Sequence, residues 1–434
     1  MITVIGAGLA GCEAAWQIAQ GGEKVHLVEM KPARYTPAHQ NSDFAELVCS
    51  NSLKAARLNS AAGLLKEEMR QMGSLLVPIA FDCRVPAGGA LAVDRHKFSA
   101  AVTNAIRNHP NIEIEEKEVE KIPEDGITVI ATGPLTTEPL AGQIDLLCGG
   151  TLRFFDAAAP IVTAESLDFS KTFSASRYDQ NTEGDYLNCP MNQAEYEAFY
   201  NALVSAQRAP VHGFDARDPK VYEGCMPVEV MAQRGPDTIR FGPLKPVGLR
   251  DPHTGHRPWA NVQLRREDAA GTLYNLVGFQ TNLKFGEQKR VFGMIPGLEQ
   301  AEFVRYGVMH RNTFLNSPKN LNAAFQMKTE PRLFFAGQMT GVEGYMESAM
   351  SGLLAGKNAL RYQQKKPLFI LPKITMSGAL AHYVEEGGNA DFQPMGANFG
   401  ILPPLSEVIR DKKERYGAFS QRALKALKEQ IESA

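Results

Sequence analysis

The N-terminal stretch constrains the fold more strongly than any other part of the chain. A short apolar run stops at Gly6, Gly8 and Gly11, and a helix-forming stretch follows directly. A second apolar run ends at Glu29, which lies 18 positions after Gly11. In a G-x-G-x-x-G motif the first glycine permits a tight turn, the second lets the backbone approach a pyrophosphate, and the third lets the helix pack closely on the strand. The motif therefore predicts a dinucleotide site in a Rossmann-type α/β fold, with Glu29 accepting hydrogen bonds from a ribose.

Two later stretches favour FAD over a nicotinamide dinucleotide. Residues 126–133 form an apolar strand that ends in an Ala-Thr-Gly turn, and residues 332–356 indicate a strand, a glycine-rich turn and a helix that begins near Gly344. In flavoproteins of the glutathione-reductase type, three such strands lie side by side. The last strand usually ends in Gly-Asp, whereas here Gly337 is followed by Gln338, which leaves an amide to hold the ribityl chain. No second G-x-G-x-x-G follows a strand, so a nicotinamide reductant has no Rossmann module of its own in this chain.

The fold prediction is an α/β protein whose Rossmann-type FAD-binding domain is discontinuous. This domain is formed by residues 1–150 and 326–434, with an excursion over about 31–93 that carries Cys49. Residues 151–325 contain short strands and turns, which indicate an inserted mixed α/β domain that lies over the flavin. The residues expected to bind FAD are Gly6, Ala7, Gly8, Leu9, Ala10, Gly11, Glu29, Thr132, Gly133, Gly337, Gln338, Glu343, Gly344 and Tyr345.

Apolar spacing predicts further helices outside these motifs. An amphipathic helix is expected near 64–72, ending at Gly73, and another over 95–108, where apolar residues recur four positions apart. Residues 410–430 predict a charged helix close to the C-terminus.

Composition and the cysteine pattern exclude several classes of protein. The chain has 434 residues and a formal net charge of −2, so no global basic field indicates a nucleic-acid partner, although local basic patches can still bind one. No run of about 18 uninterrupted apolar residues is present, and the N-terminus has neither a basic region nor a cleavage site. The six cysteines contain no C-x-x-C pair, so zinc spacing is absent. We therefore expect a cytoplasmic protein with reduced thiols, without a metal site or a membrane segment.

Two cysteines lie in unusual settings. Cys225 precedes Met226-Pro227 at a glycine-flanked corner, from which a side chain can project. Cys49 is followed by three residues that can cap a helix and then by Lys54. A thiol near a helix N-terminus and a lysine has a lowered pKa, and the thiolate is the nucleophile in covalent catalysis. Both are therefore candidate nucleophiles, the alternative being an inert small side chain. The remaining four are taken as structural: Cys12, Cys83, Cys148 and Cys189.

One histidine and five basic residues are further candidates for a functional site. His310 lies between Arg305 and Arg311, shortly before the chain returns to the third strand. Its imidazole can stack on a planar heterocycle, and the alternative is a surface histidine in a basic loop. Basic clusters in the insertion can form a phosphate track, although most charge runs are only solvated faces. The residues considered for this track are Arg265, Arg266, Lys284, Lys289 and Arg290.

Long stretches of the sequence resemble the TrmFO family, the folate- and FAD-dependent tRNA (uracil-5-)-methyltransferases of bacteria. The likeness runs from residue 1 to residues 393–405, QPMGANFGILPPL. The other stretches that carry it are GAGLAGCEAAWQIA, ELVCSNSLK, YEGCMPVEVMA, RFGPLKPVGL, NLKFGEQKRVFGMIPGLEQAEFVRYGVMHRNTF and LFFAGQMTGVEGYMESAMSGLLAG. A more distant likeness, confined to the FAD-binding parts, is to the MnmG/GidA enzymes that modify wobble uridine.

The resemblance implies a definite reaction. Members of the family methylate C5 of uridine 54 in the T-loop of tRNA, with 5,10-methylenetetrahydrofolate as the carbon donor and FAD, reduced by NADH or NADPH, as the source of electrons. Cys225 matches the family's nucleophile, whose addition to C6 of uracil makes C5 nucleophilic. Cys49 matches a second functional cysteine near the flavin, and His310 falls in the motif of a histidine that packs on the folate pterin. The target base must leave its stack to reach the thiol, so the tRNA is expected to be held through phosphates on basic patches.

The sequence leaves other functions open. A GidA-like wobble-uridine enzyme is disfavoured because the chain is short for that family and lacks a long C-terminal helical extension. A generic flavin oxidoreductase acting on small molecules is disfavoured by the two motif cysteines and by the absence of a second Rossmann fingerprint. A flavin-stabilised factor that binds or folds tRNA is open as an additional role. The division of labour between Cys49 and Cys225, the flavin atom that carries the one-carbon unit, and the oligomeric state are open as well.

Overall fold

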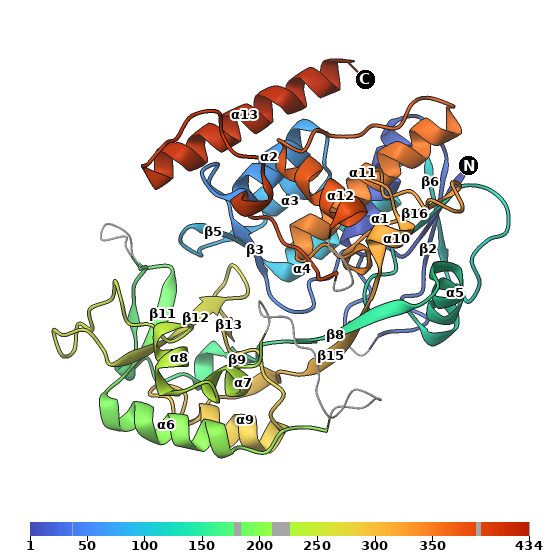
Figure 1. Cartoon of the computed structure of the whole chain (residues 1–434). Coiled ribbons are helices and arrows are strands. Elements are labelled where there is room, and N and C mark those ends of the chain that lie inside the picture. The colour runs from blue at the N-terminus through green and yellow to red at the C-terminus, as the bar shows by residue number, and fades with distance from the viewer. Residues whose placement is uncertain (37, 178–183, 211–225, 388–391, 434) are drawn as a thin grey trace.

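The chain forms an upper and a lower body, which a two-stranded ribbon joins (Figure 1). The computed structural model describes residues 1–36, 38–177, 184–210, 226–387 and 392–433, and of residues 151–156, 310 and 311 the backbone alone. The ribbon consists of β8 (Thr151–Ala157) and β15 (Met309–Leu315), which pair antiparallel. The chain therefore leaves the upper body through one ribbon strand and returns through the other.

The upper body is built on a parallel sheet of five strands in the order β16-β7-β1-β2-β6. These strands are β1 (Ile2–Ile5), β2 (Val25–Glu29), β6 (Ile112–Glu116), β7 (Thr128–Ile130) and β16 (Leu333–Phe335). Strand β7 pairs in parallel with β1 on one side and with β16 on the other, so the three strands predicted to lie side by side do so. The carboxyl ends of these strands therefore meet at one edge of the sheet, where open α/β folds bind their ligands.

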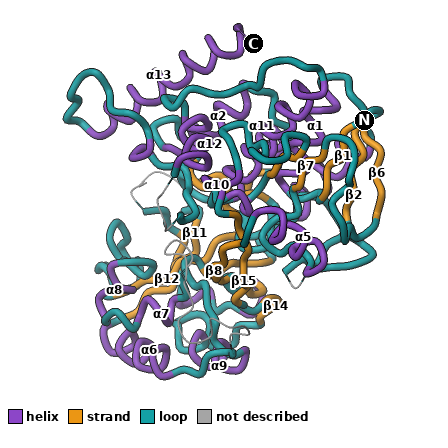
Figure 2. The backbone as a smooth tube through the Cα atoms, turned by 45° about the vertical axis from the view of Figure 1, so that its right-hand side comes forward, coloured by secondary structure: helices purple, strands orange, loops and turns teal. Residues whose placement is uncertain are grey.

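Helices cover this sheet and complete the upper body, as the purple segments around β1, β2, β6 and β7 show in Figure 2. The helices predicted near 64–72, over 95–108 and at the C-terminus are confirmed as α2, α4 and α13. Among the described residues of this body, the helices are α1 (Leu9–Gln20), α2 (Ala61–Gln71), α3 (Leu76–Asp82), α4 (Arg95–Arg107), α5 (Glu138–Cys148), α10 (Ser317–Asn320), α11 (Tyr345–Gln363), α12 (Met376–Glu386) and α13 (Lys412–Ser433). A small antiparallel sheet in the same body contains β3 (Ser52–Ala55), β5 (Ala90–Val93) and β4 (Arg84–Val85).

Helix α11 begins directly after Gly344, as predicted, and packs against α1 with the two backbones in contact. A Cβ on Gly352 would lie 2.0 Å from the Ala10 carbonyl oxygen, and one on Gly356 would lie 2.5 Å from the Ala14 carbonyl oxygen. Only glycine permits so close an approach, because any side chain would have to displace the other helix. This packing brings the start of α11 to the glycine-rich turn after β1.

The lower body is an antiparallel sheet with its own hydrophobic core. Its strands, in the order β10-β11-β12-β13-β9-β14, are β9 (Ile161–Thr163), β10 (Phe173–Ser174), β11 (Tyr186–Met191), β12 (Ala260–Arg266), β13 (Leu273–Leu276) and β14 (Phe303–Arg305). Its helices are α6 (Gln193–Ser205), α7 (Val228–Ala232), α8 (Pro236–Phe241) and α9 (Phe285–Phe292). In the core, the Phe279 ring contacts those of Phe199 and Phe292 at centroid distances of 6.2 and 5.2 Å. The predicted fold class, a Rossmann-type α/β body with a second mixed α/β part, is confirmed.

Within the described residues, every helix is too short or too polar to cross a bilayer.

Glu68 joins α2 to the N-terminus of α12 and gives the fold a dependence on pH. Its carboxylate accepts hydrogen bonds from the N–H groups of Met376 and Ser377, each at 2.7 Å. Burial raises the pKa of Glu68 to about 7, although these hydrogen bonds lower it. Because the folded state binds this proton more tightly than the unfolded state does, the contribution of Glu68 to stability falls as the pH rises from about 4.5 to about 7. Glutamine does not titrate, so we expect Glu68→Gln to lose less melting temperature than the wild type when the pH rises from about 5 to about 8. The same pH dependence in both proteins would contradict this.

Candidate active site

The turns that end β1, β7 and β16 line one pocket. The residues predicted to bind FAD that line it are Gly6, Ala7, Gly8, Leu9, Ala10, Glu29, Thr132, Gly133, Gly337, Gln338 and Tyr345. Three parts of the chain that are far apart in sequence therefore meet in one pocket.

The glycine-rich turn at the pocket wall leaves room for a diphosphate. Gly6 has φ +95°, and a Cβ there would lie 2.7 Å from the Ala131 carbonyl oxygen. Gly11 does not line the pocket, but a Cβ on it would lie 1.7 Å from the Gly6 carbonyl oxygen, so this glycine lets α1 pack on the turn. Gly8 is the N-cap of α1 and faces open space, since a Cβ there would meet nothing within 4 Å. A helix N-terminus attracts anions, so the turn fits the pyrophosphate of a dinucleotide.

Glu29 lies at the end of β2 with its carboxylate fixed at the pocket wall. One oxygen accepts the Ala7 N–H at 2.6 Å, and the other accepts the Lys31 N–H at 3.0 Å. A carboxylate has about four acceptor positions, so Glu29 can still accept hydrogen bonds from ribose hydroxyls.

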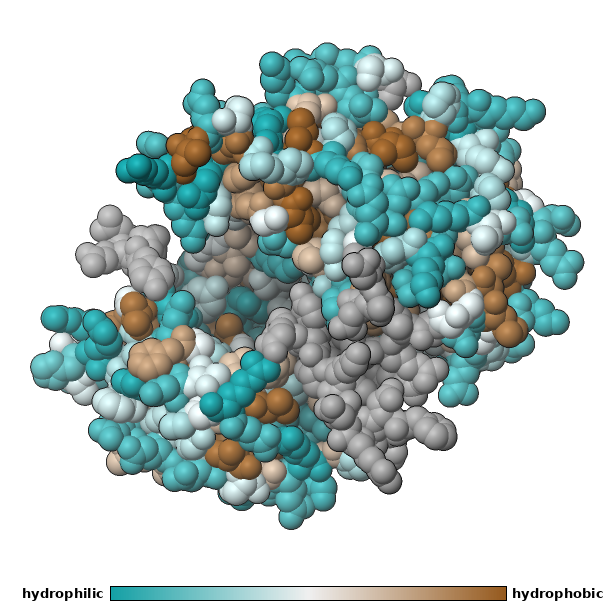
Figure 3. Space-filling view, viewed as in Figure 1, coloured by the Kyte–Doolittle hydropathy of each residue, from teal (hydrophilic) through white to brown (hydrophobic). Residues whose placement is uncertain are grey.

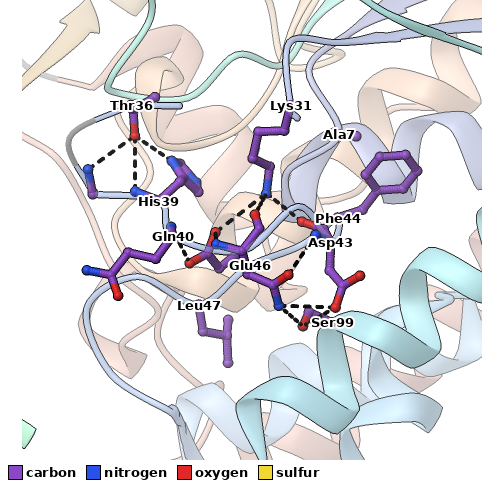
Figure 4. A network of polar contacts seen from close by, with 12 residues as sticks. Ala7, Lys31, Thr36, His39, Gln40, Asp43, Phe44, Glu46, Leu47 and Ser99 are labelled. Carbon is purple, nitrogen blue, oxygen red and sulfur yellow. Dashed lines mark hydrogen bonds and ion pairs between the residues drawn. The ribbon is translucent and has the colours of Figure 1, made fainter. Parts of the chain in front are cut away.

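A network of polar residues that the motifs did not indicate holds the wall beside Glu29 (Figure 4). The Lys31 ammonium donates to the carbonyl oxygens of Asn41, at 3.0 Å, and Asp43, and it lies 3.5 Å from the Glu46 carboxylate. The members of the network that line the pocket are Lys31, Thr36, His39 and Glu46. Lys31 lies in the turn after β2, so no strand pattern pointed to it.

Tyr345, the first residue of α11, connects the pocket with Cys49. Its hydroxyl oxygen accepts the backbone N–H groups of Cys49 at 2.7 Å and Ser50 at 3.1 Å. Burial raises the pKa of Tyr345, and the interaction with Cys49 raises it further, so the phenol stays neutral. Cys49 is therefore held at the end of the pocket that Tyr345 lines.

Arg265, on β12 of the lower body, holds the same segment from the other side. It donates to the Asn51 side-chain oxygen and to the Ser50 hydroxyl, both at 2.8 Å. Burial lowers the pKa of Arg265, but a guanidinium remains protonated at neutral pH. Both Arg265 and Arg305 interact electrostatically with Cys49. Nearby cations favour the thiolate form of a cysteine, so the environment suits a reactive thiol.

Arg95, on α4, adds a second link between the bodies beside Cys49. It donates to the Leu47 carbonyl oxygen at 2.7 Å and pairs at 2.8 Å with Glu267, which follows β12. Arg265 itself is 6% exposed, so the phosphate contact that the sequence suggested for it does not fit its buried position. The other residues considered for the phosphate track are exposed: Arg266, Lys284, Lys289 and Arg290.

The prediction of a helix N-terminus after Cys49 is wrong. The following residues form strand β3, and the Ser50 hydroxyl accepts the Ser52 N–H at 3.1 Å in a turn. The Lys54 ammonium lies 2.5 Å from the Glu347 carboxylate, so its charge is engaged away from the thiol. The positive charge near Cys49 comes instead from arginines of the lower body.

Removing the Arg265 side chain is expected to make Cys49 less reactive. Arg265→Ala removes a cation near the thiol and releases Ser50 and Asn51, so we expect alkylation of Cys49 by iodoacetamide to slow by about tenfold at neutral pH. Arg265→Lys keeps the charge but not the fork that holds two acceptors, so its rate should be intermediate. Mass spectrometry of the Cys49 peptide measures the rate, with the Cys83 peptide as the internal control. An unchanged rate in Arg265→Ala would contradict the assignment.

Two residues implied in the chemistry are not fully described. Cys225 lies outside the described residues, which resume at Met226. Three positions after Cys225, the Val228 N–H donates to the Gln280 carbonyl oxygen at 2.7 Å, which anchors the chain that follows it. His310 lies on β15, and its side chain is outside the described part.

Two residues predicted to bind FAD lie just behind the pocket wall. Glu343 accepts a hydrogen bond from the Gln338 side-chain amide at 2.7 Å, so it orients an amide that does line the pocket. Gly344 is the N-cap of α11 with φ +121°, a conformation that a side chain would strain.

Three of the cysteines taken as structural, Cys12, Cys148 and Cys189, are protected by burial. No disulfide joins the five cysteines that the structure describes. Burial raises the pKa of Cys148 to about 11 and also raises those of Cys12 and Cys189. These thiols stay protonated at neutral pH and are therefore poor nucleophiles.

Known proteins are similar to this chain over nearly its whole length. A family model described as "Glucose inhibited division protein A" matches residues 1–367. A "Methylenetetrahydrofolate--tRNA-(uracil-5-)-methyltransferase TrmFO" from Desulforamulus reducens is 59% identical over 432 residues, which are 99% of this chain and 97% of that protein. The protein of the same name from Acetivibrio thermocellus is 58% identical over 431 residues, covering 99% and 98%.

A solved structure of Aquifex aeolicus GidA has the same fold, with a TM-score of 0.71 and 17% identity. The match covers 99% of this chain but 75% of GidA, so the chain has the length of the TrmFO proteins and not that of GidA. The chain therefore belongs to the TrmFO family of methylenetetrahydrofolate--tRNA-(uracil-5-)-methyltransferases, within the wider group that the glucose-inhibited division protein A model describes.

Proposed function

We propose that this chain methylates C5 of uridine 54 in the T-loop of tRNA. The carbon comes from 5,10-methylenetetrahydrofolate, the electrons come from FAD reduced by NADH or NADPH, and the reaction takes place in the cytoplasm. The observation that carries the proposal is the near-full-length identity of 59% to a protein named for folate-dependent tRNA (uracil-5-) methylation.

The pocket residues support FAD as the resident cofactor. The N-terminus of α1 at Gly8 would hold the pyrophosphate, and Glu29 the ribose of the adenosine. The Gln338 amide, oriented by Glu343, would hold the ribityl chain in place of the usual aspartate. Bound FAD, once reduced, supplies the electrons that convert a transferred methylene group into a methyl group.

The protein groups supply the covalent step on the base. The Cys225 thiolate adds to C6 of the flipped uracil, and the electron pair of the C5–C6 double bond moves toward C5 and O4. C5 then bonds to the methylene carbon of the donor. Loss of the C5 proton would break the bond between that carbon and the donor nitrogen and leave an exocyclic methylene group, and hydride from the reduced cofactor would add to this group as the C5–C6 double bond re-forms and the sulfur leaves. Cys49 would exchange the C5 proton, and its electrostatic interactions with Arg265 and Arg305, two cations that favour a thiolate, support this role. His310 would pack on the folate, and the exposed cations around α9 would contact phosphates.

Transfer of labelled carbon tests the proposal directly. The purified FAD protein is incubated with unmodified tRNA, methylenetetrahydrofolate labelled in the methylene group, and NADPH. Label is expected at C5 of the T-loop uridine, and none when folate is omitted or S-adenosylmethionine replaces it. Label that appears only with S-adenosylmethionine, or at the wobble uridine, would overturn the proposal.

A further inference from the structure

The segment from Arg240 to Trp259, which includes the motif RFGPLKPVGL, takes no part in the site described above. Its aromatic side chains form an exposed stack around one guanidinium. The Arg240 guanidinium carbon lies 3.8 Å from the centre of the Trp259 ring and 4.8 Å from that of the Phe241 ring. The Arg240 Nε also donates to the Trp259 carbonyl oxygen at 3.1 Å. Phe241 is 60% exposed and Trp259 37% exposed, so three planar groups are fixed in place and still meet solvent.

The charges around this stack are mostly positive. From Arg240 to Trp259, both included, the chain has four arginines or lysines and a single acid, Asp251. Asp251 is buried, and its carboxylate accepts the His253 N–H at 2.9 Å and the Thr254 hydroxyl at 3.2 Å, so it shapes the turn instead of facing a partner. Asp237 faces the stack and pairs with Arg240 at 3.5 Å. The exposed basic or titratable side chains are Arg250, His253, His256 and Arg257.

Strand β12 connects this surface with the segment around Cys49. The strand begins directly after Trp259, and Arg265 near its other end holds Ser50 and Asn51. Six strand positions at about 3.3 Å each separate Trp259 from Arg265 by about 20 Å. A folded RNA with double-stranded stems extends further than this, so an RNA with a base at Cys49 can also reach the stack. Figure 3 shows the surface hollowed between the two bodies, which leaves room for such a path.

We infer that the 240–259 surface is a docking surface for RNA, in which Arg250 and Arg257 contact phosphates and the Phe241–Arg240–Trp259 stack receives an unpaired base. Unpaired bases stack on aromatic rings and on guanidinium planes, and phosphates bind exposed cations. The second exposed aromatic cluster, Phe285 with Tyr306 and Phe303, also has cations beside it, but one of them, Arg290, pairs with Glu287 at 2.6 Å. The identification of the RNA as the tRNA substrate rests on the proposed function.

Equilibrium filter binding tests the inference without requiring catalysis. Unmodified tRNA is titrated with the FAD-loaded full-length protein at several KCl concentrations. Phe241→Ala is expected to weaken binding about 5- to 100-fold with little change in the salt dependence, because it removes a stacking partner. Arg250→Ala/Arg257→Ala is expected to weaken binding and to reduce the slope of log K against log[salt] by about 1–2, because two phosphate contacts are lost.

Matched controls separate this surface from general effects. Phe169→Ala removes a phenylalanine that is 52% exposed beside Asp168, and Lys24→Ala/Lys121→Ala removes two exposed cations of the upper body. Neither control should change tRNA affinity or salt slope. Unchanged binding in both test variants would overturn the inference, and so would equal losses in the control variants. A changed gel-filtration elution volume with unchanged tRNA binding would also overturn it, because it would indicate a protein interface instead. Methyl transfer by the wild type is measured separately. If the wild type transfers no methyl group but its tRNA binding is weakened by Phe241→Ala, the proposed function is contradicted and the inference about this surface is not.

Discussion

Gly11→Ala is expected to abolish FAD binding and to destabilise the protein by several kcal/mol. The new Cβ would lie 1.7 Å from the Gly6 carbonyl oxygen and 2.9 Å from the Gly6 carbonyl carbon. Both are backbone atoms of the turn that leaves β1, and the Gly6 N–H is itself bonded to the Val28 carbonyl oxygen at 2.7 Å. Overpacking a well-packed site typically costs about 1–3 kcal/mol or more, and here no flexible side chain can yield. Alanine at a helical position otherwise gains about 1 kcal/mol over glycine, so the helix propensity acts in the opposite direction.

Gly8→Ala is the matched control for this prediction, three positions earlier in the same turn. A Cβ there would meet nothing within 4 Å, and φ is −72°, which alanine adopts without strain. The apoprotein should therefore unfold at the same urea concentration as the wild type, while FAD affinity falls by about tenfold or more, or about 1.4 kcal/mol, because the methyl group occupies the space for the diphosphate. Urea unfolding and flavin fluorescence titration measure the two effects. FAD binding by Gly11→Ala at wild-type affinity would contradict the packing argument, and undiminished binding by Gly8→Ala would place the diphosphate elsewhere.

Cys225→Ala is expected to bind FAD normally and to lose the covalent complex with RNA that carries 5-fluorouridine at the target position. The substitution removes the thiolate that adds to C6, and 5-fluorouridine traps that adduct because fluorine cannot leave as the C5 proton does. Loss of a catalytic nucleophile reduces turnover by several orders of magnitude, so methyl transfer should fall by on the order of 10⁴-fold or more. The segment that follows is anchored independently of the thiol, since the Glu229 carboxylate accepts the Thr281 hydroxyl and the Asn282 N–H, both at 2.8 Å. The fold should therefore tolerate the change.

Two other cysteine variants make this result specific. Cys83→Ala removes a half-buried thiol to which no role is assigned, and it should form the covalent complex as the wild type does. If Cys225 is the nucleophile and Cys49 exchanges the proton, Cys49→Ala should still form the covalent complex with 5-fluorouridine RNA. With unmodified tRNA, the same variant should release methylated product slowly. Gel electrophoresis under denaturing conditions detects the complex. An undiminished complex in Cys225→Ala, together with its loss in Cys49→Ala, would exchange the two assignments.

The elements that sequence patterns predicted well are those with local signals. The glycine spacing located the turn between β1 and α1. The small-residue turns after β7 and β16 located the rest of the pocket. Helices α2 and α4 were predicted from their apolar spacing, and in the structure each also has a side-chain cap: Ser60 accepts the Gly63 N–H, and Asp94 accepts the Lys97 N–H. Local patterns of this kind depend on residues within a few positions of one another.

The surroundings of Cys49 show where such reasoning ends. Ser50–Ser52 and Lys54 predicted a helix start and a nearby positive charge, but the segment continues as a strand and Lys54 pairs with Glu347. Arg265 was considered a surface cation because it stands in a basic pair, yet β12 is buried from Ala260 to Arg265 and only its last residue, Arg266, is exposed. The network of Lys31 with the 38–47 segment had no motif either, since its acceptors are mostly backbone carbonyls.

The sequence by itself determined the Rossmann-type turn, the strands that carry the FAD pocket and the family, because these follow from residue spacing and from long identical stretches. Only the tertiary structure decided what surrounds the Cys49 thiol. The segment that carries it is held by Arg265, 214 positions from its partner Asn51, and by Tyr345, 296 positions from Cys49. No local pattern encodes contacts over such separations, since they exist only where the packing of the two bodies brings β12, α11 and the Cys49 segment together.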